Sequence, residues 1–235
     1  MKTILIAEDE APIRELISYN LKLGGYNVIE AENGLRAIEL YGEAADEIDV
    51  VLLDIMMPLL DGLEVLRRIR LINNNVGIVM VSAKTQEMDK VNGLLGGADD
   101  YISKPFSPAE LMARVDAVYR RVSVSREIVS KNADKLDIIT HGDFVFNLRN
   151  RTLTKNNALV DLTQVEFQIM ELFFTNPNAA LERKAILDHV WGTSYYGDEK
   201  VVDVNIRRLR MKLEDDPSNP RYLTTIWGIG YKWIP

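Results

Sequence analysis

The 235-residue sequence predicts an α/β protein, in which a doubly wound, five-stranded parallel sheet is followed by a smaller α+β domain. The apolar run 50–53 leads directly into Asp54, and Pro58 follows, which is typical of a strand buried on both faces of a parallel sheet. Strand and helix patterns alternate through the first half. The second half instead shows short β-type runs, polar turns and amphipathic helices.

The first half contains five predicted strands and five predicted helices. The strands are expected at residues 3–7, 26–31, 50–54, 76–81 and 101–102. The helices are expected at residues 11–23, 34–45, 62–72, 86–95 and, after a Ser107 cap, 108–122. Right-handed crossovers place the carboxyl ends of these strands along one edge of the sheet, where ligands bind in such folds.

Composition and charge exclude several classes of protein. The chain has no cysteine, which rules out disulfides and thiolate metal sites. It has no run of 18 apolar residues and no basic-then-apolar leader, so we expect a soluble, cytoplasmic protein with no membrane association. Residues 1–122 carry 13 basic and 20 acidic residues, whereas residues 123–235 carry 15 of each. The acidic surplus therefore belongs to the first half.

Acidic side chains follow separate strands of the predicted sheet. Glu8 and Asp9 come after the first strand and Asp54 ends the third, whereas Ser82 and Lys104 follow the fourth and fifth. Carboxylates this close repel one another, and a hard cation such as Mg²⁺ removes that penalty. A lysine beside a metal-bound aspartate suits a phosphoryl group, because both cations neutralise its oxygens while the carboxylate attacks phosphorus.

These residues resemble a known family over residues 1–122. The motifs are Glu8-Asp9, Asp54 with Pro58 and Asp61-Gly62, Ser82-Ala83 and Lys104-Pro105-Phe106. They resemble the CheY-like receiver domain, a flavodoxin-like fold, of two-component response regulators. The resemblance implies that Asp54 accepts a phosphoryl group from a sensor histidine kinase and that the protein is not an enzyme acting on external substrates. It also implies Mg²⁺ ligation, by Glu8, Asp9, Asp54 and the backbone carbonyl of Met56.

The same resemblance assigns further roles around the phosphoacceptor. Lys104 would pair with the phosphoryl group, and its peptide bond to Pro105 would be cis. Ser82 and Tyr101 would form the pair that reorients after phosphorylation. Two other classes of α/β protein suit the sequence less well. An aspartate-based phosphatase usually has a second acid where this chain has Met56, and a nucleotide-binding protein requires a glycine-rich loop after the first strand.

Charged residues near the end of the first half allow two interpretations. They form either a solvated face or a two-fold interface like that of OmpR/PhoB-type regulators. The resemblance suggests that phosphorylation favours a homodimer with these pairs across the interface: Lys90–Glu110, Asp99–Arg121 and Asp100–Arg114.

Residues 123–137 have mixed charge and no apolar stripe, so we interpret them as a linker. A second domain is expected over residues 138–235. It begins with a small antiparallel sheet, followed by a helix capped by Thr163 with Glu166 in a capping box. Further helices are expected at 183–191 and 200–215, and a final hairpin from strands 222–226 and 231–234.

The helix expected at 200–215 carries a basic face. Val202, Ile206, Leu209 and Leu213 share one side at 3.6-residue periodicity. A projection at 100° per residue places the opposite side at Lys200, Val204, Arg207, Arg208 and Met211. Such a face suits the DNA major groove, although a solvated basic face gives the same pattern.

The helix and the hairpin together look like a winged helix-turn-helix. Residues 202–210 and 228–231 closely resemble the effector domain of the OmpR/PhoB family, which implies binding of dimers to tandem half-sites on double-stranded DNA. RNA polymerase is a further partner that the resemblance allows. The implied base contacts are Val204, Asn205, Arg208 and Arg210, and the implied phosphate contacts are Lys200, Arg207 and Thr225. Trp227 stands where many relatives have an arginine that enters the minor groove, so we do not expect a minor-groove contact here. Trp227 packs either on the sugar-phosphate backbone or within the domain, and we favour packing within the domain. The rival function is a DNA binder whose receiver is not switched by phosphate.

Overall fold

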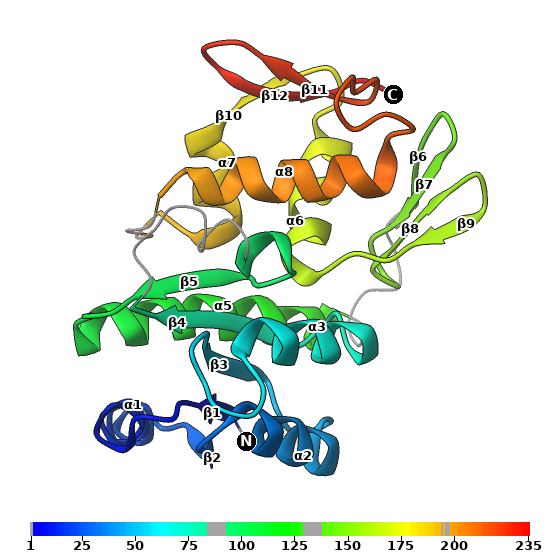
Figure 1. Ribbon diagram of the computed structural model, residues 1–235. Helices are drawn as coiled ribbons and strands as arrows, with labels where there is room; N and C mark the ends of the chain where they lie inside the picture. The colour runs from blue at the N-terminus through cyan, green and yellow to red at the C-terminus, as the bar shows by residue number, and fades with distance from the viewer. Residues whose placement is uncertain (1, 84–92, 129–137, 194, 196–197) are drawn as a thin grey trace. The chain divides into compact units, whose positions relative to one another are not determined.

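The computed structural model describes residues 2–83, 93–128, 138–193, 195 and 198–235 (Figure 1). Within these residues the chain forms two compact units, Met1–Ser123 and Val124–Pro235.

Five parallel strands of the first unit form one sheet in the order β2-β1-β3-β4-β5. They are β1 (Thr3–Ala7), β2 (Asn27–Ala31), β3 (Val50–Asp54), β4 (Gly77–Ser82) and β5 (Asp100–Ser103). Its helices are α1 (Ala11–Leu23), α2 (Gly34–Ala44), α3 (Gly62–Ile72) and α5 (Pro108–Ile128). The predicted doubly wound sheet is confirmed.

The sheet is covered on both faces, which explains the uninterrupted apolar runs of β1, β3 and β4. On one face Ile17 and Leu21 of α1, with Leu111 and Val115 of α5, pack against side chains of the central strands. Figure 1 shows α2 and α3 side by side on the other face.

The expected boundaries in this unit are close to those observed. The helices at 11–23 and 62–72 match residue for residue. The last helix runs to Ile128, six residues past the expected end at Val122. Of the helix expected at 86–95, residues 86–92 lie outside the described residues, and 93–95 are helical.

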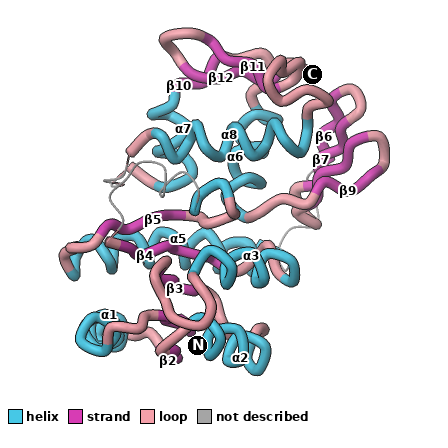
Figure 2. Tube along the Cα trace, in the orientation of Figure 1, coloured by secondary structure: helices cyan, strands magenta, loops and turns pink. Residues whose placement is uncertain are grey.

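The second unit combines two antiparallel sheets with three helices in the part of the chain that the structure describes (Figure 2). One sheet contains β6 (Ile138–His141), β7 (Phe144–Asn147), β8 (Thr152–Lys155) and β9 (Ala158–Val160) in sequence order. The other has the order β10-β12-β11, formed by β10 (Ala180–Glu182), β11 (Leu223–Ile226) and β12 (Gly230–Trp233). The helices are α6 (Gln164–Thr175), α7 (Arg183–Trp191) and α8 (Lys200–Leu213).

The expected elements of the second unit are confirmed, apart from the three-residue strand β10, which the sequence analysis missed. Thr163 caps α6, and the reciprocal capping-box bonds with Glu166 are both present. The core between the sheets is aromatic. Phe146 stacks on Phe174 with 4.8 Å between ring centroids, and Phe174 stacks on Trp233 at 5.1 Å.

Candidate functional site

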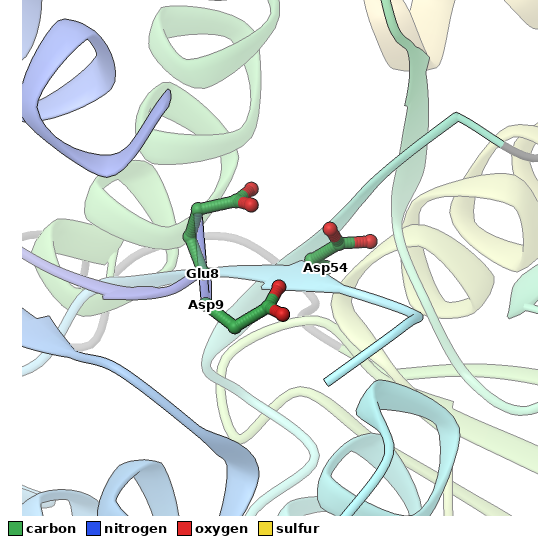
Figure 3. Close-up of side chains that lie close together, drawn as sticks. All are labelled: Glu8, Asp9 and Asp54. Carbon is green, nitrogen blue, oxygen red and sulfur yellow. The ribbon is translucent and has the colours of Figure 1, made fainter. Parts of the chain in front are cut away.

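The carboxyl ends of β1 and β3 bring three acidic side chains together. Glu8 and Asp9 directly follow β1, and Asp54 is the last residue of β3, its hydrogen-bonded neighbour. Each residue offers a carboxylate oxygen, and these oxygens all lie within 4.8 Å of one another. Figure 3 shows the three carboxylates converging on a common space.

Lys104, which follows β5, supplies the positive charge of this cluster. Its Nζ lies 2.7 Å from Asp54 Oδ2 and 2.7 Å from Glu8 Oε2. Glu8 and Asp54 are buried, whereas Asp9 is exposed. One ammonium group therefore faces two buried carboxylates, and a third carboxylate beside them is open to solvent.

The charges of the cluster favour the binding of a cation. Burial raises the pKa of Glu8 to about 7, with a further increase from the Asp54 charge, although Lys104 acts in the opposite direction. Burial lowers the pKa of Lys104, but its hydrogen bonds and ion pairs with Asp54 and Glu8 raise it by more. The carboxylates thus carry more negative charge than one lysine compensates. Their oxygens are the donors that Mg²⁺ prefers, so the residues fit this ion.

The loop after β3 is held close to the phosphoacceptor candidate. The backbone N–H of Met56 donates to Asp54 Oδ1 at 3.2 Å. A Cβ atom at Gly62 would lie 1.9 Å from the carbonyl oxygen of Asp54, which real contacts do not allow. Glycine at position 62 is therefore required for α3 to begin beside Asp54.

The remaining predicted residues of this cluster lie on β4 and β5. Ser82 and Tyr101 are buried, and the carbonyl of Ser82 accepts a hydrogen bond of 2.9 Å from the backbone N–H of Lys104. This bond fixes the backbone from which the lysine side chain extends. The Lys104–Pro105 peptide bond is cis, as predicted.

The charges predicted for a two-fold interface make pairs within the chain. Asp99 Oδ2 lies 2.8 Å from Arg70 Nη2, and the backbone N–H of Ile78 donates to the same oxygen at 2.7 Å. Arg114 reaches Asp100 at 3.2 Å and Glu110 at 3.0 Å. Arg121 is buried, and Lys90 lies outside the described residues. Arg70 was not predicted, because the spacing of residues on α3 gives no signal for this pair.

The second predicted site is the outward face of α8. Lys200, Arg207 and Met211 are exposed. Val204, Asn205 and Arg208 are buried, so the projection that placed Val204 and Arg208 on the open side was wrong. Asn205 donates to the carbonyl of Val201 at 2.8 Å, which holds its amide against the helix.

Arg208 makes a buried ion pair that the sequence did not predict. Its Nη2 lies 3.0 Å from Oε1 of Glu166, which is itself fully buried. Glu166 was predicted only as the capping-box partner of Thr163. Because α6 and α8 are separated in sequence, no local pattern signals their pairing.

The hairpin β11–β12 is joined to α8 by Arg210. This side chain donates to the carbonyl of Leu223 and to Oγ1 of Thr225, each at 2.8 Å. Trp227, at the hairpin turn, is 91% exposed. The expectation that Trp227 packs within the domain was therefore wrong, because the residue lies at the exposed turn of the hairpin.

Two families match this chain. Residues 4–116 match the family described as "Response regulator receiver domain", and residues 156–233 match the family described as "Transcriptional regulatory protein, C terminal". The acidic cluster and Lys104 lie in the first match, and α8 and the hairpin lie in the second.

Two curated relatives cover nearly the whole chain. The "Probable transcriptional regulator ycf27" of Cyanidium caldarium is 40% identical over 233 residues, which are 97% of this chain and 92% of the relative. The "Uncharacterized transcriptional regulatory protein YcbL" of Bacillus subtilis is 39% identical over 231 residues, which are 97% of this chain and 98% of the relative.

Solved structures agree with the fold. The structure of a RitR mutant has a TM-score of 0.77 at 22% identity and covers 99% of both chains. A response regulator receiver domain from Clostridium thermocellum has a TM-score of 0.51 at 25% identity, covering 53% of this chain and 98% of that domain. Within the described residues, no helix has the length and apolar character needed to cross a membrane. The chain belongs to the OmpR/PhoB-type two-component response regulators, transcriptional regulators that combine a receiver domain with a DNA-binding domain.

Proposed function

We propose that this protein is a cytoplasmic regulator switched by phosphorylation of Asp54, with a sensor histidine kinase as the donor. The proposal rests above all on the cluster of Glu8, Asp9 and Asp54, in which Lys104 Nζ lies 2.7 Å from both Asp54 and Glu8. A buried aspartate beside a fixed cation is the arrangement that accepts a phosphoryl group.

Glu8, Asp9, Asp54 and the carbonyl of Met56 are the residues that would hold Mg²⁺, which when bound offsets charge on the phosphoryl oxygens. An oxygen of Asp54 forms the new bond to phosphorus while the bond between phosphorus and the donor breaks. Lys104 then moves from the aspartate to a phosphoryl oxygen. This move is favoured because Lys104 is already ion-paired with Asp54, where the phosphoryl group is attached.

The switch in this proposal uses Ser82 and Tyr101. The Ser82 hydroxyl binds a phosphoryl oxygen, and Tyr101 changes position with it. The receiver then pairs through Lys90–Glu110, Asp99–Arg121 and Asp100–Arg114. Within the chain, Asp99 already pairs with Arg70 and Asp100 with Arg114, so these in-chain pairs compete with the proposed pairs across the interface.

The dimer places two effector domains on tandem half-sites of double-stranded DNA, where RNA polymerase is a further partner. The exposed cations Lys200 and Arg207 are the phosphate contacts that the geometry favours. Arg210 and Thr225, which bond each other, position the hairpin beside α8. We assign Val204, Asn205 and Arg208 to the interior instead, because their side chains are buried.

Incorporation of phosphate from acetyl phosphate tests the phosphoacceptor. We expect Mg²⁺-dependent labelling of the wild-type chain and none of Asp54→Asn. Asp61→Asn is the matched control, because Asp61 caps α3 through a hydrogen bond from Glu64 that asparagine also accepts. Sedimentation with and without acetyl phosphate then tests dimerisation. Labelling of Asp54→Asn, or a wild-type chain that takes up no phosphate, contradicts the proposal.

A further inference from the structure

An arginine in the first turn of α1 contacts the loop that carries two acids of the cluster. Arg14 Nη1 donates to the carbonyl of Glu8 at 2.7 Å and to the carbonyl of Asp9 at 3.4 Å. Side chains of an α-helix point back toward its N-terminus, so an arginine at this position reaches the loop that precedes the helix. The Arg14 side chain is 17% exposed, so this contact is largely withdrawn from solvent.

Arg14 binds backbone oxygens of this loop and leaves its carboxylates open. Lys104, in contrast, binds the carboxylates of Glu8 and Asp54 directly. The backbone N–H of Glu8 donates to the carbonyl of Ala31 at 3.1 Å, at the end of β2. The backbone of Glu8 is therefore held at both its N–H and its carbonyl, which restricts the direction in which its carboxylate points.

A carboxylate on β2 holds the guanidinium group of Arg14 in place. Glu30 Oε2 lies 3.9 Å from Arg14 Nε. The other oxygen of Glu30 accepts hydrogen bonds from Ser18 at 2.6 Å and from Lys22 at 3.2 Å. The bond from Ser18 lowers the pKa of Glu30, and although burial raises it, Lys22 and Arg14 lower it further. Glu30 therefore stays ionised and links Arg14 to β2, the neighbour of the strand that leads into the loop.

We propose that Arg14 is a positioning residue for Mg²⁺. It fixes the backbone of residues 8 and 9, so that the carboxylates of Glu8 and Asp9 face Asp54 before the ion binds. This inference rests on the proposed phosphorylation of Asp54 and adds a residue that acts on the ligands without touching the ion. Residues that orient metal ligands in this way typically contribute tenfold to hundredfold to metal affinity.

The direction of the change in Mg²⁺ affinity separates positioning from simple charge. Arg14 is positively charged and lies near a site for a cation, so through its charge alone it would oppose Mg²⁺ binding, and its removal would strengthen binding. A positioning role predicts the opposite change. Calorimetric titration of the full-length chain with magnesium chloride measures the affinity. We expect Arg14→Met, which keeps a long side chain without donors or charge, to bind Mg²⁺ roughly tenfold to hundredfold more weakly.

Two further variants complete the design. Lys22→Met is the matched control, because Lys22 lies on the same helix and binds the same Glu30 but does not contact the loop, and it should leave Mg²⁺ affinity unchanged. Arg14→Lys keeps the charge and a donor but lacks the fork of the guanidinium group, so it should recover part of the lost affinity. Thermal unfolding in EDTA, followed by circular dichroism, verifies that each variant is folded. If Arg14→Met does not fold, Arg14→Lys alone is compared with the wild-type chain, and weaker Mg²⁺ binding is still expected.

Phosphate uptake from acetyl phosphate gives a second measurement. The Mg²⁺ concentration at half-maximal rate should rise in Arg14→Met by the same factor as the dissociation constant. The rate at saturating Mg²⁺ should stay close to that of the wild-type chain, because the bound ion then holds the same ligands. A general loss of structure would lower the saturated rate as well.

The outcomes separate this inference from the proposed function. If folded Arg14→Met binds Mg²⁺ as tightly as the wild-type chain or more tightly, or if Lys22→Met weakens binding equally, Arg14 does not position the ligands. A lower saturated rate with an unchanged half-maximal Mg²⁺ concentration also contradicts the inference. If the wild-type chain itself binds no Mg²⁺ and takes up no phosphate, the proposed function fails.

Discussion

Arg208 of α8 and Glu166 of α6 form an ion pair, with 3.0 Å between Arg208 Nη2 and Glu166 Oε1, and both side chains are buried. Lys212 Nζ lies 2.7 Å from the other carboxylate oxygen, which also accepts the backbone N–H of Thr163. Burial raises the pKa of Glu166, but the charges of Arg208 and Lys212 lower it by more. The carboxylate stays ionised, and one buried charge links α6 to α8.

We predict that Arg208→Ala acts on folding. Removing Arg208 leaves the buried Glu166 carboxylate with Lys212, 2.7 Å away, as its cationic partner. We therefore expect a loss of about 3 kcal/mol of unfolding free energy, the lower end of the range for breaking a buried ion pair. All three tryptophans lie in residues 124–235, so urea unfolding followed by fluorescence reports on this unit within the full chain. Arg207→Ala, on the exposed side, should change stability by less than about 0.5 kcal/mol. If Arg208→Ala keeps the wild-type stability but binds DNA more weakly, the prediction is wrong and Arg208 contacts DNA.

The buried Arg208–Glu166 pair shows why the sequence predicted the bounds of α8 better than which of its side chains are exposed. The helical range and the stripe of Val202, Ile206 and Leu209 follow from periodicity, which is a local property. The projection assumed a single covered side. In the fold α8 contacts both α6 and α7, so a wider arc is buried and takes in Val204 and Arg208.

The receiver site was more predictable because its geometry depends on topology. The strand order places the ends of β1 and β3 side by side, so acids at those ends must converge wherever the sheet forms. Ion pairs that depend on the direction of a side chain could not be predicted from the topology. Arg70 and Asp99 illustrate this, because nothing in the α3 pattern indicates that the arginine turns toward β5.

Gly62 should be essential for the phosphoacceptor strand. A Cβ there would lie 1.9 Å from the carbonyl oxygen of Asp54, so Gly62→Ala must displace the backbone of either α3 or β3. We expect a loss of at least about 2 kcal/mol in stability, together with slower phosphate uptake from acetyl phosphate.

Gly42 provides the matched control for that substitution. It lies in α2 with no atom within 4 Å of an added Cβ. Gly42→Ala should therefore stabilise the receiver by up to about 1 kcal/mol, measured by thermal unfolding followed by circular dichroism. Equal effects of the two substitutions would show that the close approach at Gly62 is unimportant.

Mg²⁺ should stabilise the receiver through Asp9. At a concentration roughly one hundredfold above the dissociation constant, a ligand that binds only the folded state adds about 2.7 kcal/mol. We expect chelation with EDTA to lower the thermal midpoint of the wild-type chain. Asp9→Asn should weaken Mg²⁺ binding, measured by calorimetric titration, with little change in stability without metal, because Asp9 is exposed. Asp46→Asn removes an exposed acid elsewhere in the unit and should preserve Mg²⁺ affinity.

His141 should make the second unit less stable in mild acid. The indole N–H of Trp233 donates to Nδ1 of His141 at 3.1 Å, so this nitrogen must be unprotonated in the folded state. Burial lowers the pKa of His141 from its ordinary value of 6.5. The unfolded chain therefore takes up a proton at higher pH than the folded one. The contribution to stability is complete above the unfolded pKa and is lost as pH falls through the folded pKa.

Urea unfolding followed by tryptophan fluorescence, at about pH 7.5 and about pH 5, measures this loss. His141→Gln should lose less stability than the wild-type chain between the two conditions, because the titrating ring is gone. His189→Gln removes the other histidine and is the matched control, for which the wild-type loss is expected. If His141→Gln and the wild-type chain lose equal stability, the bond from Trp233 does not oppose protonation. The loss in acid would then have to come from the carboxylates that the same pH change titrates.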